Sequence, residues 1–207
     1  YRFADAGRVV KEKHVSGLYT GDLFKLDIEK CYFLENGLEL GRSFVQQRYW
    51  GKRSLDYLWY GIGAYLAKNP HYRYLFGPVS ISNAMPQTAK ELLIYFYKLY
   101  FSGPEDITPS RNPFRFSQPL SFLAKEFSGI NYRADFMRLK SLLSNLGTTK
   151  PPLDKQYTEL CEPGGVVILD FNIDPAFNIC VDGLVIVDLH RLKLPKKKRY
   201  IDDRFLL

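Results

Sequence analysis

The pattern of side chains from Glu39 to Lys68 predicts a strand, a basic turn and a helix. Residues from Glu39 to Val45 alternate with a period of two, so Glu39 and Arg42 are expected on opposite faces of a strand. Apolar residues then recur at three- and four-residue spacing over 55–66, which is typical of an amphipathic helix packed on that strand. We expect the rest of the chain to be organised around this unit.

A second apolar run, from Tyr72 to Ser82, predicts a buried strand that is interrupted at Gly77-Pro78. Proline removes a backbone donor, so pairing on one side of this strand must break or bulge there. The turn-rich segment from Gly17 to Phe24 is interpreted as a loop, either at the rim of a pocket or on the plain surface. The other predicted elements are a short helix over 27–34, helices over 86–101 and 136–146, and an antiparallel pair of strands over 165–172 and 181–189.

Residues 103–135 are expected to form an irregular insertion within a single domain. They show little periodicity, yet their phenylalanines and leucines are too apolar for a solvated linker. A chain of 207 residues can bury a substantial core without disulfides or structural metals. The mixture of strand and helix patterns places the chain in the α/β (α+β) class.

Composition narrows the classes of partner. The formal net charge is +7 with only 3 His, which favours nucleic acid, an anionic membrane surface or an acidic carrier protein. No module that reads nucleic-acid bases is present, so nucleic acid is not the expected partner. Cys31, Cys161 and Cys180 are odd in number and lack metal-ligand spacing, so we expect three structural thiols, a reducing compartment and no metal.

Membrane insertion is not predicted, because no apolar run reaches the length of a transmembrane helix and no signal peptide is present. The chain starts at Tyr1-Arg2-Phe3, which looks like a strand entered midway, so an upstream segment is expected. Four consecutive cations, Lys196 to Arg199, are either a solvated tail or a contact for anionic lipid or a carrier protein.

The turn from Gln46 to Ser54 is a candidate anion site. Its relevant residues are three cations, a glycine and a candidate helix N-cap, namely Arg48, Gly51, Lys52, Arg53 and Ser54. A basic turn that opens into a helix offers unpaired N–H groups and the positive end of the helix dipole to a phosphate-bearing ligand. Polar turns before helices also occur without any ligand, and this alternative stays open.

The order strand, R-x-x-G turn, helix, strand, helix resembles the GNAT acyltransferase fold, although the last glycine of that superfamily's turn is not present. Further motifs look like the haemolysin-like N-acyltransferases, a group that includes ornithine-lipid and N-acyl-amino-acid synthases and is similar in fold to the acyl-homoserine-lactone synthases. These motifs are Glu39-Leu40-Gly41-Arg42-Ser43, Leu58-Trp59-x-Gly61-Ile62, Tyr74-Leu75-Phe76-Gly77, Pro151-Pro152-Leu153, Asp174-Pro175-x-Phe177 and Asp182-Gly183-Leu184-Val185.

The resemblance implies a GNAT-like central mixed sheet with splayed parallel strands, flanked by helices and lacking the first strands of the family. Residues 1–207 would then be one N-acyltransferase domain, the C-terminal part of a longer bacterial chain. It implies a cytoplasmic enzyme, peripheral at the inner face of the membrane, that takes a long (3-hydroxy)acyl group from acyl carrier protein. The acceptor would be the α-amine of an amino acid such as ornithine or glycine. The length of the 103–135 insertion is similar to that in long forms that carry a fused lysolipid O-acyltransferase domain.

The resemblance also assigns roles at the start of the reaction. Glu39 would deprotonate the acceptor amine, unless it is a salt-bridge partner of a neighbouring arginine. Arg42 would bind the acceptor carboxylate or fix Glu39 in place. Backbone N–H groups around Phe44 and Val45 would hold the oxyanion of the thioester. Asp182 would bind the acceptor ammonium, unless it is a turn residue that opens a strand.

The donor side follows from the same resemblance. The turn from Arg48 to Ser54 would take the phosphopantetheine phosphate, and its cations would also meet an acidic carrier protein. The break at Gly77-Pro78 would keep the two parallel strands apart, so that the acyl-phosphopantetheine arm enters between them. No cofactor would be bound permanently. Two alternatives stay open: an acyl-CoA-dependent GNAT enzyme acting on a small amine, and a lipid-binding or haemolysin-like membrane-active protein.

Overall fold

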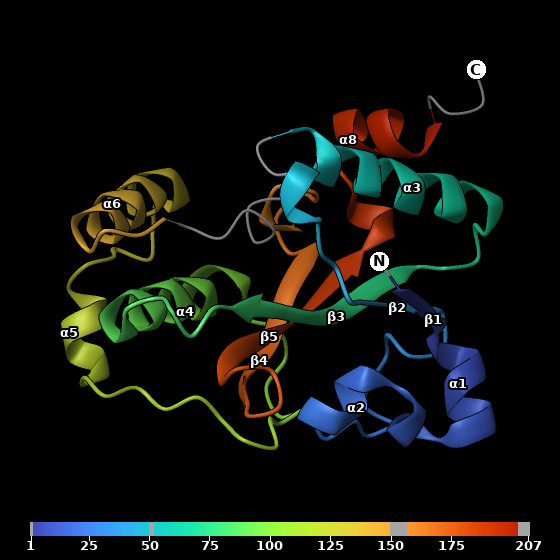
Figure 1. The fold of residues 1–207 in the computed structure, drawn as a ribbon, viewed down its shortest axis with the longest axis horizontal. Coiled ribbons are helices and arrows are strands. Elements are labelled where there is room, and N and C mark those ends of the chain that lie inside the picture. Colours follow the sequence, from blue (N-terminus) through green and yellow to red (C-terminus); the bar gives the residue numbers. More distant parts are fainter. Residues whose placement is uncertain (1, 50–51, 150–156, 203–207) are drawn as a thin grey trace.

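A computed structural model describes residues 2–49, 52–149 and 157–202. It is a mixed α/β structure in which one five-stranded sheet is flanked by helices (Figure 1). The strands are β1 (Arg2–Asp5), β2 (Gly37–Gly41), β3 (Tyr74–Ile81), β4 (Val166–Asp174) and β5 (Cys180–Asp188). The helices are α1 (Ala6–Lys13), α2 (Tyr19–Leu23), α3 (Ser54–Lys68), α4 (Gln87–Phe101), α5 (Leu120–Ala124), α6 (Tyr132–Asn145) and α8 (Leu194–Tyr200).

The strand order in the sheet is β1-β2-β3-β5-β4. Strands β2 and β3 are parallel, and the other neighbouring strands are antiparallel. Strand β3 pairs with β5 along its whole length, from Tyr74 opposite Asp188 to Ile81 opposite Val181. The fold class predicted from the sequence, a mixed sheet flanked by helices, is therefore confirmed.

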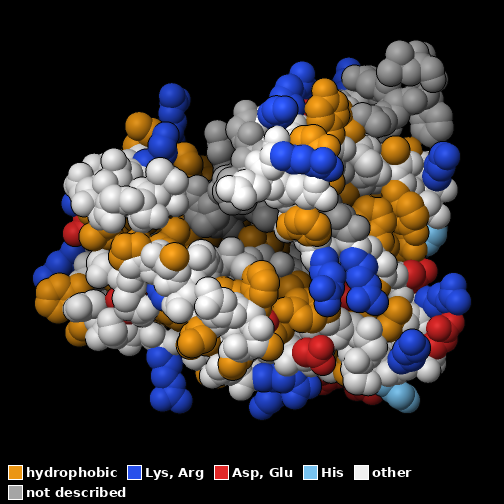
Figure 2. Space-filling model, in the orientation of Figure 1, with side chains coloured by type: hydrophobic (Ala, Val, Ile, Leu, Met, Phe, Trp, Pro, Cys, Tyr) orange, Lys and Arg blue, Asp and Glu red, His pale blue; other side chains and the backbone are white. Residues whose placement is uncertain are grey.

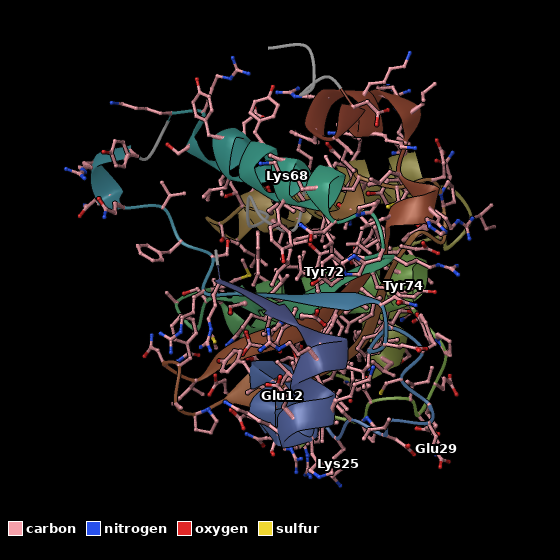
Figure 3. The ribbon with its side chains drawn as sticks, turned by 90° about the vertical axis from the view of Figure 1, so that its right-hand side faces the viewer. Glu12, Lys25, Glu29, Lys68, Tyr72 and Tyr74 are labelled. Atoms are coloured by element: carbon pink, nitrogen blue, oxygen red, sulfur yellow. The ribbon has the colours of Figure 1, made fainter. Side chains whose placement is uncertain are left out.

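The two faces of the sheet bury different cores. Helices α3 and α4 cover one face, where the core includes Leu75, Trp59 and Leu93. Helices α1 and α2 and the turns that follow them cover the other face, where Phe24, Phe33 and neighbours pack. Figure 3 places Tyr72 between α3 and the sheet, where its hydroxyl donates to Asp5 Oδ2 at 3.1 Å. Both faces of the parallel pair are thus closed by helices, as parallel strands require.

Most of the predicted elements are present. Helices α3 and α4 and the antiparallel pair β4–β5 agree with the predictions to within one or two residues. Helix α6 begins four residues earlier than predicted because Asn131 caps it, with its side chain accepting from Ala134 N. Segment 103–131 holds only one short helix, α5, among irregular turns. All three cysteines are free and buried, as expected.

Three predictions in the first half of the chain are wrong. The segment predicted as a helix over 27–34 forms turns, because the Asp27 side chain and carbonyl accept from Glu29 N and Cys31 N and close the chain locally. The segment interpreted as a loop from Gly17 to Phe24 contains helix α2, whose Thr20 is fully buried. The strand predicted to reach Val45 ends at Gly41.

Asp135 joins α6 to the end of α4 and to the preceding loop. Its buried carboxylate accepts from Tyr100 Oη at 2.5 Å, from Ser128 N at 3.0 Å and from Gly129 N at 2.9 Å. Burial alone would raise the pKa of Asp135, but these hydrogen bonds outweigh burial and hold the pKa below its usual value.

Asp135→Asn is therefore expected to lower the free energy of unfolding by about 2 kcal/mol at pH 7, because hydrogen bonds to a charged acceptor are lost. The carboxylate stabilises the fold fully above the pKa of the unfolded chain, about 3.9, and this contribution disappears as the pH falls through the lower folded pKa. Urea unfolding at pH 7 and at pH 3 measures both effects. Glu105→Gln, in an exposed loop, is the matched control. An equal loss for Asp135→Asn at both pH values would contradict this account.

Candidate active site

The parallel strands β2 and β3 part in the middle of the sheet. They pair only from Gly37 opposite Tyr74 to Glu39 opposite Phe76, although both strands continue beyond these residues. A Cβ atom at Gly77 would lie 2.2 Å from the Leu40 carbonyl oxygen, so strands β2 and β3 are in close contact where their pairing stops. From there to Ile81, β3 keeps its antiparallel partner β5 but is not paired with β2. This is the geometry expected for the splayed strands.

Glu39 lies at the point of parting and is 6% exposed. Its Oε1 accepts from Thr20 N at 2.7 Å and its Oε2 accepts from Tyr19 N at 3.3 Å, so the first turn of α2 holds both carboxylate oxygens. No ion pair joins Glu39 to an arginine within the described residues, and the salt-bridge alternative is therefore wrong for that part of the chain. Each oxygen keeps a further lone pair that can accept a proton or a water hydrogen bond.

Tyr19 links Glu39 to a second carboxylate, that of Asp174. Its hydroxyl donates to Asp174 Oδ2 at 2.9 Å. Asp182 lies inside β5 and is 1% exposed, and it accepts from Ser80 Oγ at 2.5 Å. Asp182 is therefore an interior strand residue, and the alternative that it opens the strand from a turn is wrong.

These carboxylates lie on the sheet face that α2 covers. Residues two apart in a strand share a face, so Ser80 faces the same side as Phe76, the register partner of Glu39. Burial and the nearby charge of Asp174 raise the pKa of Asp182, despite the hydrogen bond from Ser80. Burial and the hydrogen bond to Asp174 likewise raise the pKa of Tyr19, which keeps its hydroxyl protonated as a donor. The structure brings Glu39 and Asp182 to one face, where Tyr19 bonds to Glu39 through its backbone N–H and to Asp174 through its hydroxyl.

The residues after β2 adopt a different conformation from the predicted strand. Arg42 has a φ of 49°, in the left-handed region, which ends the ladder. Its side chain is exposed, so Arg42 does not fix Glu39. Phe44 is 70% exposed and Val45 is half-buried, and both follow the end of the strand. Their proposed contact with a thioester oxygen therefore depends on a loop rather than on a strand.

The basic turn leads into α3 as predicted, but its side chains have other partners. The Arg48 guanidinium stacks over the Tyr49 ring at 4.7 Å, and Arg53 pairs with Asp56 at 2.8 Å. Asp56 also pairs with Arg199 at 2.6 Å, so one acid is shared by two cations. Lys52 is exposed, and Gly51 lies outside the described residues.

Ser54 is the first residue of α3 and not its N-cap. Its hydroxyl donates to the Tyr49 carbonyl at 3.0 Å, while Arg53 occupies the N-cap position without a side-chain cap bond. Within the described residues, the first N–H groups of α3 thus have no capping side chain at the N-cap position. An uncapped N-terminus next to exposed cations is chemically suited to a phosphate.

Sequence reasoning assigned no role in the site to Tyr19, Thr20 or Asp174, although it allowed Gly17–Phe24 to rim a pocket and placed Asp174 in a family motif. The apolar residues Leu18 and Leu23 around Thr20 were a signal of burial, but not of contact with Glu39. Among the residues with described positions, no group of three His, Cys, Asp or Glu side chains is placed to hold a metal ion.

Comparison with known proteins agrees with this geometry. Residues 1–60 match the family model described as acetyltransferase (GNAT) domain. The chain is 29% identical over 135 residues to a glycine N(α)-acyltransferase of Bacteroides thetaiotaomicron. The aligned segment covers 62% of this chain and 40% of that relative. It is 27% identical over 135 residues to a protein of the same description from Phocaeicola vulgatus, and the aligned segment covers 62% of this chain and 41% of that relative. No solved structure matches.

The fold and these matches point to the same class of protein. Residues 1–60 are similar to the GNAT acetyltransferase domain, the chain is similar to bacterial glycine N-acyltransferases over 135 residues, and its mixed sheet with parted parallel strands is consistent with a GNAT-like fold. Both of these relatives are described as N-acyltransferases. The match spans about two fifths of the length of these relatives.

Proposed function

We propose that this chain catalyses transfer of a long (3-hydroxy)acyl group from the phosphopantetheine thioester of acyl carrier protein to the α-amine of an amino acid. The relatives' description makes glycine the first acceptor to test, and ornithine the second. The observation that carries the proposal is the parting of β2 and β3 at a buried carboxylate, Glu39. Unpaired strand edges offer backbone groups to an extended pantetheine arm.

The proposed reaction needs no permanently bound group. The neutral amine nitrogen attacks the thioester carbonyl carbon, a C–N bond forms, the C–S bond breaks, and the thiol leaves with a proton. Glu39, directly or through water, accepts the proton that the amine loses. Backbone N–H groups at Phe44 and Val45 are proposed to stabilise the oxyanion, and Asp182 to attract the acceptor ammonium before attack.

The donor side is proposed to use the basic turn before α3. Arg48, Lys52, Arg53 and Ser54, with Gly51, would surround the phosphate of the pantetheine arm. Basic side chains are spread over the molecular face shown in Figure 2, where acidic ones are few. Such a surface would attract an acidic carrier protein. Because the product is amphiphilic, we also propose that the enzyme acts at the inner face of the cytoplasmic membrane. We propose further that this domain belongs to a longer chain that includes an O-acyltransferase domain.

The full-length protein, incubated with either a long-chain 3-hydroxyacyl carrier protein or the matching acyl-CoA, tests the donor and the acceptor together. We expect N-acyl product with glycine, and a kcat/KM at least tenfold higher with the carrier protein than with CoA, because carrier contacts add to phosphate contacts. Mass spectrometry of the products with a panel of amino acids measures this.

Two outcomes would redirect the proposal. Equal rates with CoA would favour the acyl-CoA-dependent enzyme and remove the carrier protein as partner. Absence of N-acyl product with every amine, together with leakage of dye-loaded vesicles, would favour a membrane-active protein. In the described part of the chain, no helix is long and apolar enough to cross a membrane.

A further inference from the structure

A cavity of about 400 Å³ lies at the end of the sheet, and no described residue of the basic turn before α3 lines it. Its walls come from the first turns of α4, from residues 112–115 and from the ends of β4 and β5. Phe114, Ile173 and Val181 provide apolar surface, while Lys90 and Arg115 provide charge. Among the described residues, no aspartate or glutamate lines it. A cavity with apolar walls and a few polar groups is the usual form of a small-molecule site.

Lys90 is the unusual residue of this cavity. It is only 7% exposed, and its ammonium donates to the amide oxygen of Asn83 at 3.2 Å. No ion pair of Lys90 with a carboxylate occurs among the described residues. The adjacent Glu91 directs its Oε1 to Ser117 N and Oγ at 2.6 and 2.7 Å, and it does not line the cavity. A largely buried lysine whose hydrogen-bond partner among the described residues is a neutral amide would be stabilised by an anion in the cavity.

Arg115 adds a second cation to the same cavity. Its side chain is exposed and forms no hydrogen bond or ion pair within the part of the chain that is described. A guanidinium and a buried ammonium around one cavity match the oxygens of a carboxylate or a phosphate. We infer that this cavity, with Lys90 and Arg115 in its lining, binds an oxyanion group of one of the two substrates.

The position of the cavity relates it to the reaction. Asn83 follows the end of β3, and β2 and β3 run in parallel towards this edge after they part. A ligand in the cavity would thus approach the parted strands from the edge where both of them end. The oxyanion is either the carboxylate of the acceptor amino acid or the phosphate of the donor arm, and the second outcome would replace the phosphate site proposed at the turn before α3. The inference rests on the proposed function for its choice of these two sources.

Lys90→Met removes the charge and keeps the length and helix propensity of the side chain. Lys98→Met, on the exposed side of the same helix, is the matched control, and Arg42→Met tests the rival carboxylate ligand. If the cavity holds the acceptor carboxylate, Lys90→Met raises the KM for glycine by roughly 10- to 100-fold. Lys90→Met then leaves the slow acylation of glycinamide, which lacks the carboxylate, unchanged. If the cavity holds the phosphate, the KM for the acyl donor rises instead.

Several results would overturn the inference. The first is a Lys90→Met protein with unchanged KM values for both substrates. The second is an equal loss of activity with glycine and with glycinamide in Lys90→Met, without a change in the KM for the donor. The third is loss of the preference for glycine over glycinamide in Arg42→Met alone. Isothermal titration of the full-length protein with glycine and with pantetheine 4′-phosphate separates this inference from the proposed function. Binding of either probe that Lys90→Met abolishes supports the oxyanion site even if no amine is acylated. Binding of neither probe, or binding unaffected by the variant, refutes it.

Discussion

Glu39→Gln is expected to lower kcat by roughly 10²- to 10⁴-fold, the usual loss when a general base is removed. Without a base, reaction depends on the fraction of acceptor amine that is already neutral. The variant should therefore recover activity as the pH is raised, more steeply than the wild-type protein does. Measuring kcat/KM for glycine between pH 6 and pH 9 checks both the size and the slope of the effect.

The glutamine amide keeps one acceptor oxygen for Thr20 N but presents an N–H₂ group to Tyr19 N, which accepts nothing. Some loss of stability is expected, so thermal unfolding of Glu39→Gln must be compared at the assay temperature. Glu29→Gln, an exposed turn residue, is the control. A folded Glu39→Gln protein that retains wild-type kcat and pH profile would remove Glu39 from the mechanism.

Gly77→Ala is expected to lower the free energy of unfolding by about 2–4 kcal/mol and to reduce activity more than tenfold. The added Cβ would lie 2.2 Å from the Leu40 carbonyl oxygen, a backbone atom that can move only if β2 moves. Displacing β2 would shift Glu39, because Glu39 is next to Leu40 in this strand. Urea unfolding and kcat/KM measure the two effects.

Gly61→Ala is the matched control. It adds the same methyl group within α3, where nothing lies within 4 Å of the new Cβ. Alanine in a helix interior is favoured over glycine by about 0.5–1 kcal/mol, so this variant should be neutral or slightly stabilising. If Gly77→Ala behaved like Gly61→Ala, close contact at the point of parting would not be essential for the site.

Local pattern determined the regular elements of the chain. The three- and four-residue spacing of apolar positions predicted α3 and α4, and the two apolar runs near the C-terminal end predicted β4 and β5. The Gly77-Pro78 pair marked the place where β3 loses its pairing with β2, because proline cannot donate to a ladder. These features depend on neighbours in sequence, and neighbours in sequence are visible without a structure.

Only the tertiary structure decided how the site is assembled. Glu39 is held by Tyr19 and Thr20, twenty and nineteen residues away, and Tyr19 in turn reaches Asp174, 155 residues away. The end of β2 was likewise decided by the left-handed Arg42, not by the alternation that continued through it. Contacts of this kind depend on which backbone N–H groups and side chains the folded sheet brings together. A buried carboxylate takes whichever donors lie within reach, and the chain's local pattern carries no record of them.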